Sequence, residues 1–267
     1  MDFAGETPVG PASFDVAEDG SVVVVDQANR RLVLVDANGG RRVVPVEISA
    51  GISDVRFTAV GDVVVFEEAP AAVVKLFTTD GVLLDSARLG NAIAGGLGRD
   101  AAGVWALEGP QQEWRLVVRA GDRAVLAPEE QAVLLGNWAG SSDGGRDLRV
   151  SVRPDETRLA VIDSAGAAAR VVSLRGGGLN QGALHVAHLD EAGGGLVVQA
   201  MYGDTATGHV SVFAVLQLED GKIASVTVLP ESAAAETSPR GRFRFVDGRL
   251  YQSRLDDGSY TIVEVGL

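Results

Sequence analysis

The sequence has no cysteine, only three histidines, and lysine at just two positions, Lys75 and Lys222. The missing cysteines exclude disulfide bonds, thiolate nucleophiles, iron–sulfur clusters and cysteine-ligated zinc. Three histidines leave little material for a zinc site built on imidazole. No apolar run approaches the ~18 residues that a transmembrane helix needs, so no membrane span is expected.

Charge and composition describe a soluble, acidic, globular protein. The 267 residues carry 23 Lys and Arg against 36 Asp and Glu, a formal net charge of −13. This charge disfavours binding to nucleic acid or to an anionic membrane, because both are themselves negative. The chain is 46% hydrophobic, which supplies enough apolar surface for a core without disulfides or a structural metal.

Thirty-four glycines and a valine-rich apolar fraction indicate many short strands joined by tight turns. Two glycine series recur along the chain. The first, between an expected first and second strand, comprises Gly20, Gly61, Gly103, Gly145, Gly194 and Gly248. The second, between an expected third and fourth strand, comprises Gly39, Gly81, Gly121, Gly166 and Gly221. Neighbouring members lie about 40 to 55 residues apart, and such spacing is typical of a repeat protein.

The expected strands are apolar without interruption, as in residues 22–25, 32–35 and 63–66. A sheet with one wet face would alternate apolar and polar residues, so both faces of these strands are expected to be buried. Blades packed face to face around an axis satisfy that condition and leave few exposed edges. A parallel α/β sheet would need crossover helices, and no amphipathic stretch of that length occurs. The pattern predicts an all-β fold, a six-bladed β-propeller of four-stranded antiparallel blades.

The six blades are expected to fill a single domain, residues 1–267. They are placed at residues 13–49, 52–90, 94–128, 132–174, 184–229 and 242–265. The last blade holds only three strands, so residues 1–9 are expected to pair as its fourth strand. Such closure is needed because an open propeller would expose an apolar blade face. A propeller of this size is expected to be a monomer.

The first blade contains a recognisable set of residues: Asp15-Val16-Ala17, Asp19-Gly20, residues 25–32, and Asp36 with Gly39. In these residues the blade resembles an NHL-type repeat. NHL repeats form six-bladed propellers, in a superfamily that includes gluconolactonase-like and strictosidine-synthase-like proteins. The resemblance is clear over about one blade and implies the fold but no single activity, because this architecture hosts binding modules and unrelated enzymes.

Among gluconolactonase-like proteins, the resemblance implies a central divalent ion held by Glu, Asn and Asp near the axis. Asn91, Asn137 and Asn180 fall near the starts of blades, where such ligands arise. No acidic partner with a recognisable motif lies at the start of the first blade, so no ligand is carried over. The sequence predicts no cofactor, with calcium as the alternative.

Acidic residues recur in the loops between the expected second and third strands. They are Asp26, Glu67, Glu68, Glu108, Asp155, Glu156, Asp204, Asp256 and Asp257. In a propeller these loops emerge on one face, so their carboxylates would form a ring able to supply the oxygen ligands that calcium takes. The alternative is that they are solvated turn residues, since the opposite face carries acidic residues as well.

Two of the three histidines, His185 and His188, lie three residues apart on the expected first strand of the fifth blade. Successive strand residues face opposite sides, so this pair is poorly placed to share one metal ion. Both histidines are expected to form hydrogen bonds. If a ligand binds near the propeller axis, both are expected to face it.

No nucleophile, acid–base pair or set of metal ligands can be assigned by spacing, so no catalytic residue is predicted. The expected function is that of a non-enzymatic binding module that recognises a protein, a peptide or a glycan through one loop face. The alternative is a divalent-metal-dependent lactonase or esterase acting at the axial mouth, which needs charged groups that converge in a pocket. The scarcity of lysine and the lack of cysteine favour an exported protein over a cytoplasmic one.

Overall fold

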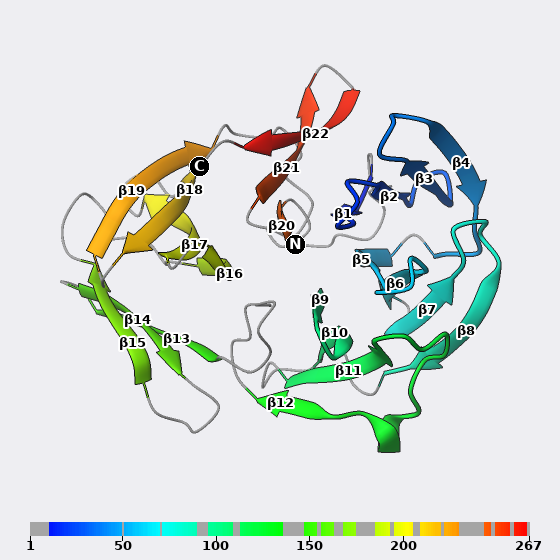
Figure 1. The fold of residues 1–267 in the computed structure, drawn as a ribbon, viewed down its shortest axis with the longest axis horizontal. Coiled ribbons are helices and arrows are strands. Elements are labelled where there is room, and N and C mark those ends of the chain that lie inside the picture. The colour runs from blue at the N-terminus through cyan, green and yellow to red at the C-terminus, as the bar shows by residue number, and fades with distance from the viewer. Residues whose placement is uncertain are drawn as a thin grey trace. The chain divides into compact units, whose positions relative to one another are not determined.

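The computed structural model of the chain consists almost entirely of strands and short turns (Figure 1). It describes residues 11–49, 51–69, 71–89, 96–108, 113–135, 147–153, 156–162, 168–174, 185–192, 195–204, 209–219, 222–229, 243–246, 249–256 and 259–265. The chain divides into two compact units, Met1–Leu134 with Ser232–Val265 (unit 1) and Leu135–Glu231 with Gly266–Leu267 (unit 2).

Unit 1 contains sheets whose strands follow one another in chain order, so each sheet is an antiparallel meander. The first sheet consists of β1 (Ser13–Val16), β2 (Val22–Asp26), β3 (Arg31–Val35) and β4 (Arg41–Pro45). The second consists of β5 (Gly51–Phe57), β6 (Val63–Ala69), β7 (Val73–Phe77) and β8 (Leu83–Arg88). The third consists of β9 (Leu97–Asp100), β10 (Gly103–Glu108), β11 (Glu113–Arg119) and β12 (Val133–Leu135). The last consists of β20 (Phe243–Val246), β21 (Arg249–Asp256) and β22 (Ser259–Val265).

Unit 2 contains two further antiparallel meanders. One consists of β13 (Asp147–Arg153), β14 (Glu156–Ile162) and β15 (Ala168–Leu174). The other consists of β16 (His185–Ala192), β17 (Gly195–Asp204), β18 (His209–Glu219) and β19 (Lys222–Leu229). The described residues thus form six antiparallel sheets and confirm the all-β prediction. No helix in the described part of the chain has the length and apolar character required to cross a bilayer.

The tight turns of the first sheet follow from its Asp and Gly residues. The Gly20 amide donates to the Ala17 carbonyl oxygen at 3.0 Å, and the Gly39 amide donates to the Asp36 carbonyl oxygen at 2.9 Å. The Asp36 carboxylate also accepts a hydrogen bond from the Gly40 amide at 2.9 Å. Gly20 and Gly39 have positive φ, which glycine adopts without a steric penalty. All six members of the two glycine series that the structure describes have positive φ. Five of them lie between strands, as predicted, and Gly103 is the first residue of β10.

Strand β6 of the second sheet is buried on both faces. In β6, Val63 and Val65 belong to a core shared with the first sheet, whereas Val64 and Phe66 belong to a core shared with the third. All four side chains are fully buried. Because alternate residues of a strand point to opposite faces, each face of the second sheet has its own core. The uninterrupted apolar run is the consequence of this packing.

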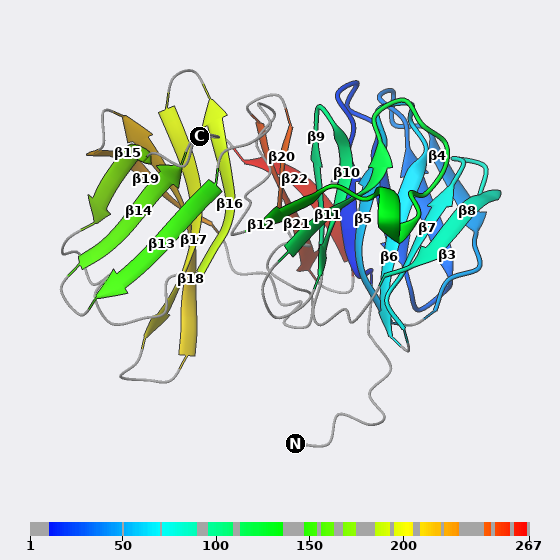
Figure 2. The same cartoon turned by 90° about the horizontal axis from the view of Figure 1, so that it is seen from below.

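The first strands of the four sheets in unit 1 lie side by side (Figures 1 and 2). Strand β1 contacts both β5 and β20, and β5 in turn contacts β9. A separate apolar cluster, which includes Phe14, Val24 and Val246, joins the first sheet to the β20–β22 sheet. These contacts bring together residues from four segments that are far apart in the sequence.

Strand β12 corrects one expected blade boundary. Residue 132 is expected from the sequence to begin a fourth blade, but β12 is hydrogen-bonded to β11 as the outer strand of the third sheet. A single turn of 3-10 helix at Pro128–Glu130 precedes β12. The chain then returns alongside β11, where the Leu116 amide donates to the Ala132 carbonyl oxygen at 3.0 Å. The other blade boundaries stay predictions.

The segment expected to complete the last blade, residues 1–9, lies outside the described residues. Among the described residues, the β20–β22 sheet has three strands, whereas the first three sheets have four. Deletion of residues 1–9 is therefore expected to lower the melting temperature by several degrees, because loss of a closing strand exposes apolar sheet surface. Differential scanning fluorimetry of the truncated and full-length chains measures the shift, and equal melting temperatures would contradict the expectation.

Candidate functional site

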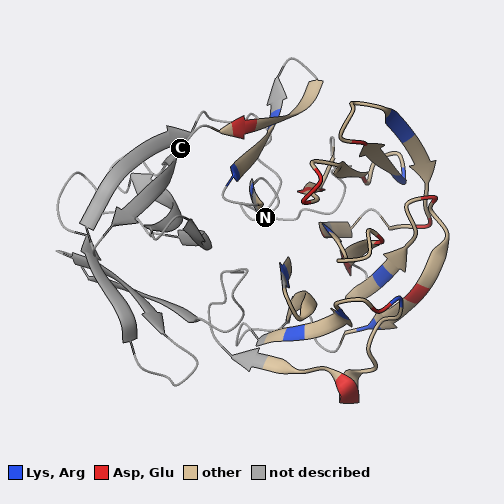
Figure 3. Cartoon of the chain, viewed as in Figure 1, with Lys and Arg blue, Asp and Glu red and all other residues tan. Residues whose placement is uncertain are grey.

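Charged residues occur on the adjoining first strands of unit 1, where the ribbon is coloured blue for Lys and Arg and red for Asp and Glu in Figure 3. The group, which we call the inner cluster, comprises Ser13 and Asp15 of β1, Asp54 and Arg56 of β5, Arg99 of β9, and Arg244 of β20. Asp15, Asp54 and Arg244 are almost completely buried. Buried charges are stable only when they are paired and hydrogen-bonded, and the contacts of the two carboxylates show how this condition is met.

Asp54 ties together the four first strands. Its Oδ1 accepts hydrogen bonds from the Ser13 hydroxyl at 2.7 Å and from Arg244 Nη2 at 2.5 Å. The amide of Val55 also donates to Oδ1, at 2.9 Å. Its Oδ2 accepts a hydrogen bond from the Leu97 amide at 2.7 Å. One carboxylate on β5 therefore contacts β1, β9 and β20.

Asp15 makes the corresponding link from the first sheet to the second. Its Oδ2 accepts a hydrogen bond from the Phe57 amide at 2.8 Å. Its Oδ1 lies 3.4 Å from Arg244 Nε and 3.5 Å from Arg56 Nη1. Burial raises the pKa of the Asp15 carboxyl above its ordinary value, and the charges of Arg99 and Arg244 act in the opposite direction.

Arg99 differs from the other two arginines of the cluster. Its Nη1 is 3.9 Å from Asp15 Oδ2, which is beyond hydrogen-bond distance. Its side chain is 23% exposed, whereas the exposed fractions are 3% for Arg244 and 10% for Arg56. Arg99 is thus the arginine of the cluster that solvent reaches most readily.

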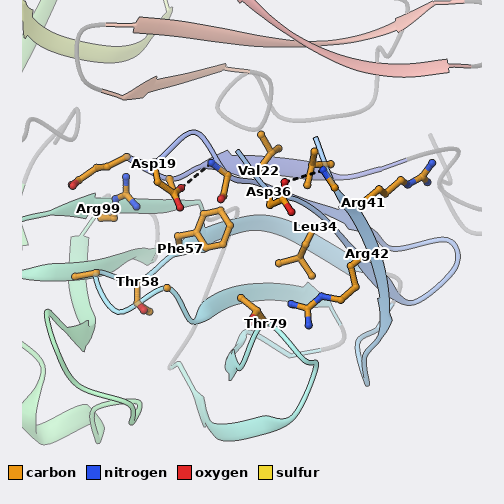
Figure 4. A pocket seen from close by; sticks show the side chains of 17 residues that line it. Asp19, Val22, Leu34, Asp36, Arg41, Arg42, Phe57, Thr58, Thr79 and Arg99 are labelled. Atoms are coloured by element: carbon orange, nitrogen blue, oxygen red, sulfur yellow. Dashed lines mark hydrogen bonds between the residues drawn. The ribbon is translucent and has the colours of Figure 1, made fainter. Parts of the chain in front are cut away.

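The exposed side of Arg99 faces a groove of about 840 Å³ on the hairpin-turn side of the first two sheets (Figure 4). The turns β1–β2, β3–β4 and β5–β6 supply most of its lining, and Thr79 of the β7–β8 turn adds to it. Val22, Leu34 and Phe57 contribute apolar surface. In Figure 4, Arg99 lies at one end and Arg42 at the other, with Phe57 and Leu34 between them.

The groove carries charges of both signs. Asp19 accepts a hydrogen bond from the Ser21 amide at 2.8 Å. The Asp36 carboxylate likewise accepts hydrogen bonds from two backbone amides of its own turn. Arg42 forms an ion pair with Asp80. Asp19 and Asp36 thus stabilise turns that line the groove, while Arg42 and Arg99 lie at its outer and inner ends.

The structure gives two of the predicted acidic residues internal partners. Asp26 is buried and accepts hydrogen bonds from Arg31 Nε at 2.7 Å and Asn29 Nδ2 at 2.9 Å. Glu67 is also buried, with Lys75 Nζ 2.9 Å from its Oε1. These carboxylates are part of the sheet structure. Neither lines the groove, which lies at the opposite ends of the strands.

The other predicted residues are placed by their backbone or lie outside the described residues. Glu68 is exposed near the end of β6. Glu108 ends β10, Glu156 begins β14, Asp204 ends β17 and Asp256 ends β21. Asp155, Asn180 and Asp257, together with Asn91 and Asn137, lie outside the described residues. Within the described residues, no three Asp, Glu or His side chains gather as a set that could hold a metal ion.

The strand geometry at the two histidines differs from the simple alternation expected of them. His185 lies opposite Met201 and His188 lies opposite Gln199, with a register shift between Val186 and His188. A bulge adds one residue to a strand without advancing its partner. Between His185 and His188 the chain therefore advances three residues on β16 for two on β17, and the faces to which the two side chains point stay a prediction.

The inner cluster was not predicted from the sequence. The available signal was a charged residue inside an otherwise apolar first strand, as in Phe14-Asp15-Val16 and Val55-Arg56-Phe57. A charge at such a position has to be paired on folding. The partners could not be identified in advance, because Arg244 lies 190 residues from Asp54.

Comparisons with known proteins identify the fold. A scan against protein-family models finds none that matches the chain, and a search of curated proteins finds no match either. Among solved structures, a luciferin-regenerating enzyme is similar with a TM-score of 0.53 at 12% identity, over 98% of this chain and 92% of that one.

Two further structures are similar at lower scores. Regucalcin from Agrobacterium tumefaciens, a calcium-binding protein, has a TM-score of 0.49 at 12% identity over 98% of this chain and 91% of its own. Virginiamycin B lyase from Staphylococcus aureus has a TM-score of 0.48 at 12% identity over 100% of this chain and 87% of its own. Together with the succession of antiparallel meanders, the likeness to the luciferin-regenerating enzyme identifies the fold of this chain as a β-propeller.

Proposed function

We propose that this β-propeller is a non-enzymatic binding module that holds an extended peptide segment of a partner protein in the groove of unit 1. The observation that carries the proposal is the form of the groove, an apolar middle between polar ends. Specific sites commonly combine apolar lining with a few polar groups that fix the orientation of the ligand. Loops and turns on a rigid sheet scaffold are also where binding residues concentrate.

The dimensions of the groove support a peptide. Its lining runs from the turns beside the first strands, β1 and β5, to the turns beside the outer strands, β4 and β8. Four neighbouring strands span three intervals of about 4.8 Å, or about 14 Å, which equals the length of about four residues of extended chain. A short extended segment would thus place alternate side chains over Phe57 and Leu34 while its ends meet charged groups.

Selection of peptides from a random library displayed on phage tests the proposal. Substitution of Thr79, a half-buried residue of the groove lining, by tryptophan fills the groove. Peptides selected on the unaltered protein are expected to bind Thr79→Trp at least tenfold more weakly, measured by fluorescence anisotropy, because the added ring occupies the space of the ligand. Thr261→Trp, at an exposed position on β22, serves as the matched control and is expected to bind normally.

Two results would contradict the proposal. One is that no peptide is enriched on the unaltered protein, and the other is that the selected peptides bind Thr79→Trp as tightly as Thr261→Trp. Turnover of lactone or ester substrates in the presence of calcium would instead support the metal-dependent hydrolase that the sequence leaves as the alternative.

A further inference from the structure

The inner cluster contains more positive than negative charge. Its guanidinium groups belong to Arg56, Arg99 and Arg244, and its carboxylates to Asp15 and Asp54. One positive charge is therefore left without a carboxylate of its own inside the cluster. In a partly buried site this imbalance matters, because charge interactions are stronger there than in bulk water.

The distances identify Arg99 as the arginine that carries the surplus charge. Arg244 hydrogen-bonds directly to Asp54, and Arg56 lies within 4 Å of both carboxylates. Arg99 approaches one oxygen of Asp15 at 3.9 Å, and that oxygen already accepts the Phe57 amide at 2.8 Å. Among the described residues, the guanidinium of Arg99 forms no hydrogen bond, although it has five N–H donors.

Arg99 is also the member of the inner cluster that lines the groove. A solute in the groove therefore reaches this guanidinium and none of the buried carboxylates. We infer that Arg99 binds a carboxylate of the ligand at the inner end of the groove, through the planar pair of donors that a guanidinium presents. The identity of the ligand as a peptide rests on the proposed function, in which case the carboxylate is an Asp or Glu side chain or the C-terminus.

The rim of the groove favours a carboxylate over a more highly charged anion. Glu18 and Asp19 belong to the β1–β2 turn and line the groove, and Figure 4 shows Asp19 at the same end as Arg99. Their negative charges repel an incoming anion in proportion to its charge. A phosphate dianion is thus disfavoured relative to a monocarboxylate, and the two acidic residues act as a selectivity element.

The apolar surface beside Arg99 indicates a suitable probe. Hexanoate combines one carboxylate with a short apolar chain that can lie over Phe57 and Leu34. Titration followed by NMR or calorimetry is expected to show hexanoate binding the unaltered protein at least tenfold more tightly than hexanamide, and more tightly than inorganic phosphate at the same ionic strength. Equal binding of hexanoate and hexanamide would overturn the inference, and stronger binding of phosphate would overturn its selectivity element.

Arg99→Gln removes the charge and is expected to weaken hexanoate binding at least tenfold. Arg119→Gln, at an exposed position on β11, removes the same charge from a residue that does not line the groove and is expected to leave binding unchanged. Circular dichroism melts confirm that both variants fold. Should Arg99→Gln fail to fold, Arg99→Lys keeps the charge but loses the paired donors, and unchanged hexanoate affinity in that variant would overturn the inference.

The peptides selected on the unaltered protein test the carboxylate site at Arg99 separately from the peptide-binding function. They are expected to be enriched in acidic residues and to lose affinity on Arg99→Gln. If they bind in the groove but are insensitive to Arg99→Gln, the carboxylate site is wrong and the peptide-binding function stands. If hexanoate binding depends on Arg99 while no peptide is selected, the site stands and the peptide-binding function is wrong.

Discussion

Arg244→Met is expected to lower the free energy of unfolding by about 3–5 kcal/mol, because it leaves two buried carboxylates without their nearest cation. Arg244 Nη2 hydrogen-bonds to Asp54 at 2.5 Å and to the Ser13 hydroxyl at 2.7 Å. Its Nε lies 3.4 Å from Asp15, and its guanidinium carbon is 5.3 Å from the centre of the Phe14 ring. Methionine restores the apolar contact with Phe14 but none of the polar ones.

Urea denaturation at neutral pH measures this loss, and the chain offers a close control. Arg249 on β21 is exposed and lies 3.5 Å from an exposed carboxylate oxygen of Glu264. Surface ion pairs of this kind contribute about 0–1 kcal/mol. The loss in free energy of unfolding is therefore expected to be several times smaller for Arg249→Met than for Arg244→Met. Similar losses for the two variants would show that the inner cluster does not stabilise the fold.

A double variant separates the ion pair from general packing. Asp54→Asn combined with Arg244→Met removes both partners of the 2.5 Å contact. Because residues in one network are energetically coupled, the double variant is expected to lose clearly less stability than the sum of the two single losses. Additive losses would contradict a direct interaction between Asp54 and Arg244.

The sheets of this propeller could be predicted from the sequence because their signals are local. Residues 63–66 show this well. Their side chains pack alternately into two different cores, so neither side of the strand faces solvent and all four residues are apolar. The turn glycines are equally local, because a positive φ at positions such as Gly20 depends on a few neighbouring residues. These two signals were enough to predict strands at residues 22–25, 32–35 and 63–66, which lie in β2, β3 and β6.

Features that depend on contacts between sheets could not be predicted in the same way. Strand β12 joins the third sheet through the Ala132 carbonyl and a short 3-10 turn, and no residue pattern distinguishes that from the start of a new blade. The bulge beside His188 depends on its pairing with β17. The groove is assembled from turns of two sheets and from Arg99 of a third, so no single stretch of sequence carries its pattern.

Gly103→Ala is expected to lower the free energy of unfolding by about 3 kcal/mol or more, because it combines a backbone conformation that side chains rarely adopt with a collision. Gly103 has φ of +143°. A Cβ added there would lie 2.0 Å from the Val118 carbonyl oxygen and 2.9 Å from the Ala120 amide nitrogen. Both are backbone atoms of the β11 segment, and relief of the collision would require β10 and β11 to separate where Gly103 pairs with Arg119.

Gly61→Ala isolates the conformational part of this effect. Gly61 occupies the equivalent turn in the second sheet with φ of +83°, but a Cβ added there meets nothing within 4 Å. The left-handed backbone alone costs about 1–2 kcal/mol for a non-glycine residue, so Gly61→Ala is expected to be the more stable variant. Chemical denaturation of both variants measures the difference, and equal losses would show that the close approach of β11 to Gly103 is not a constraint on the third sheet.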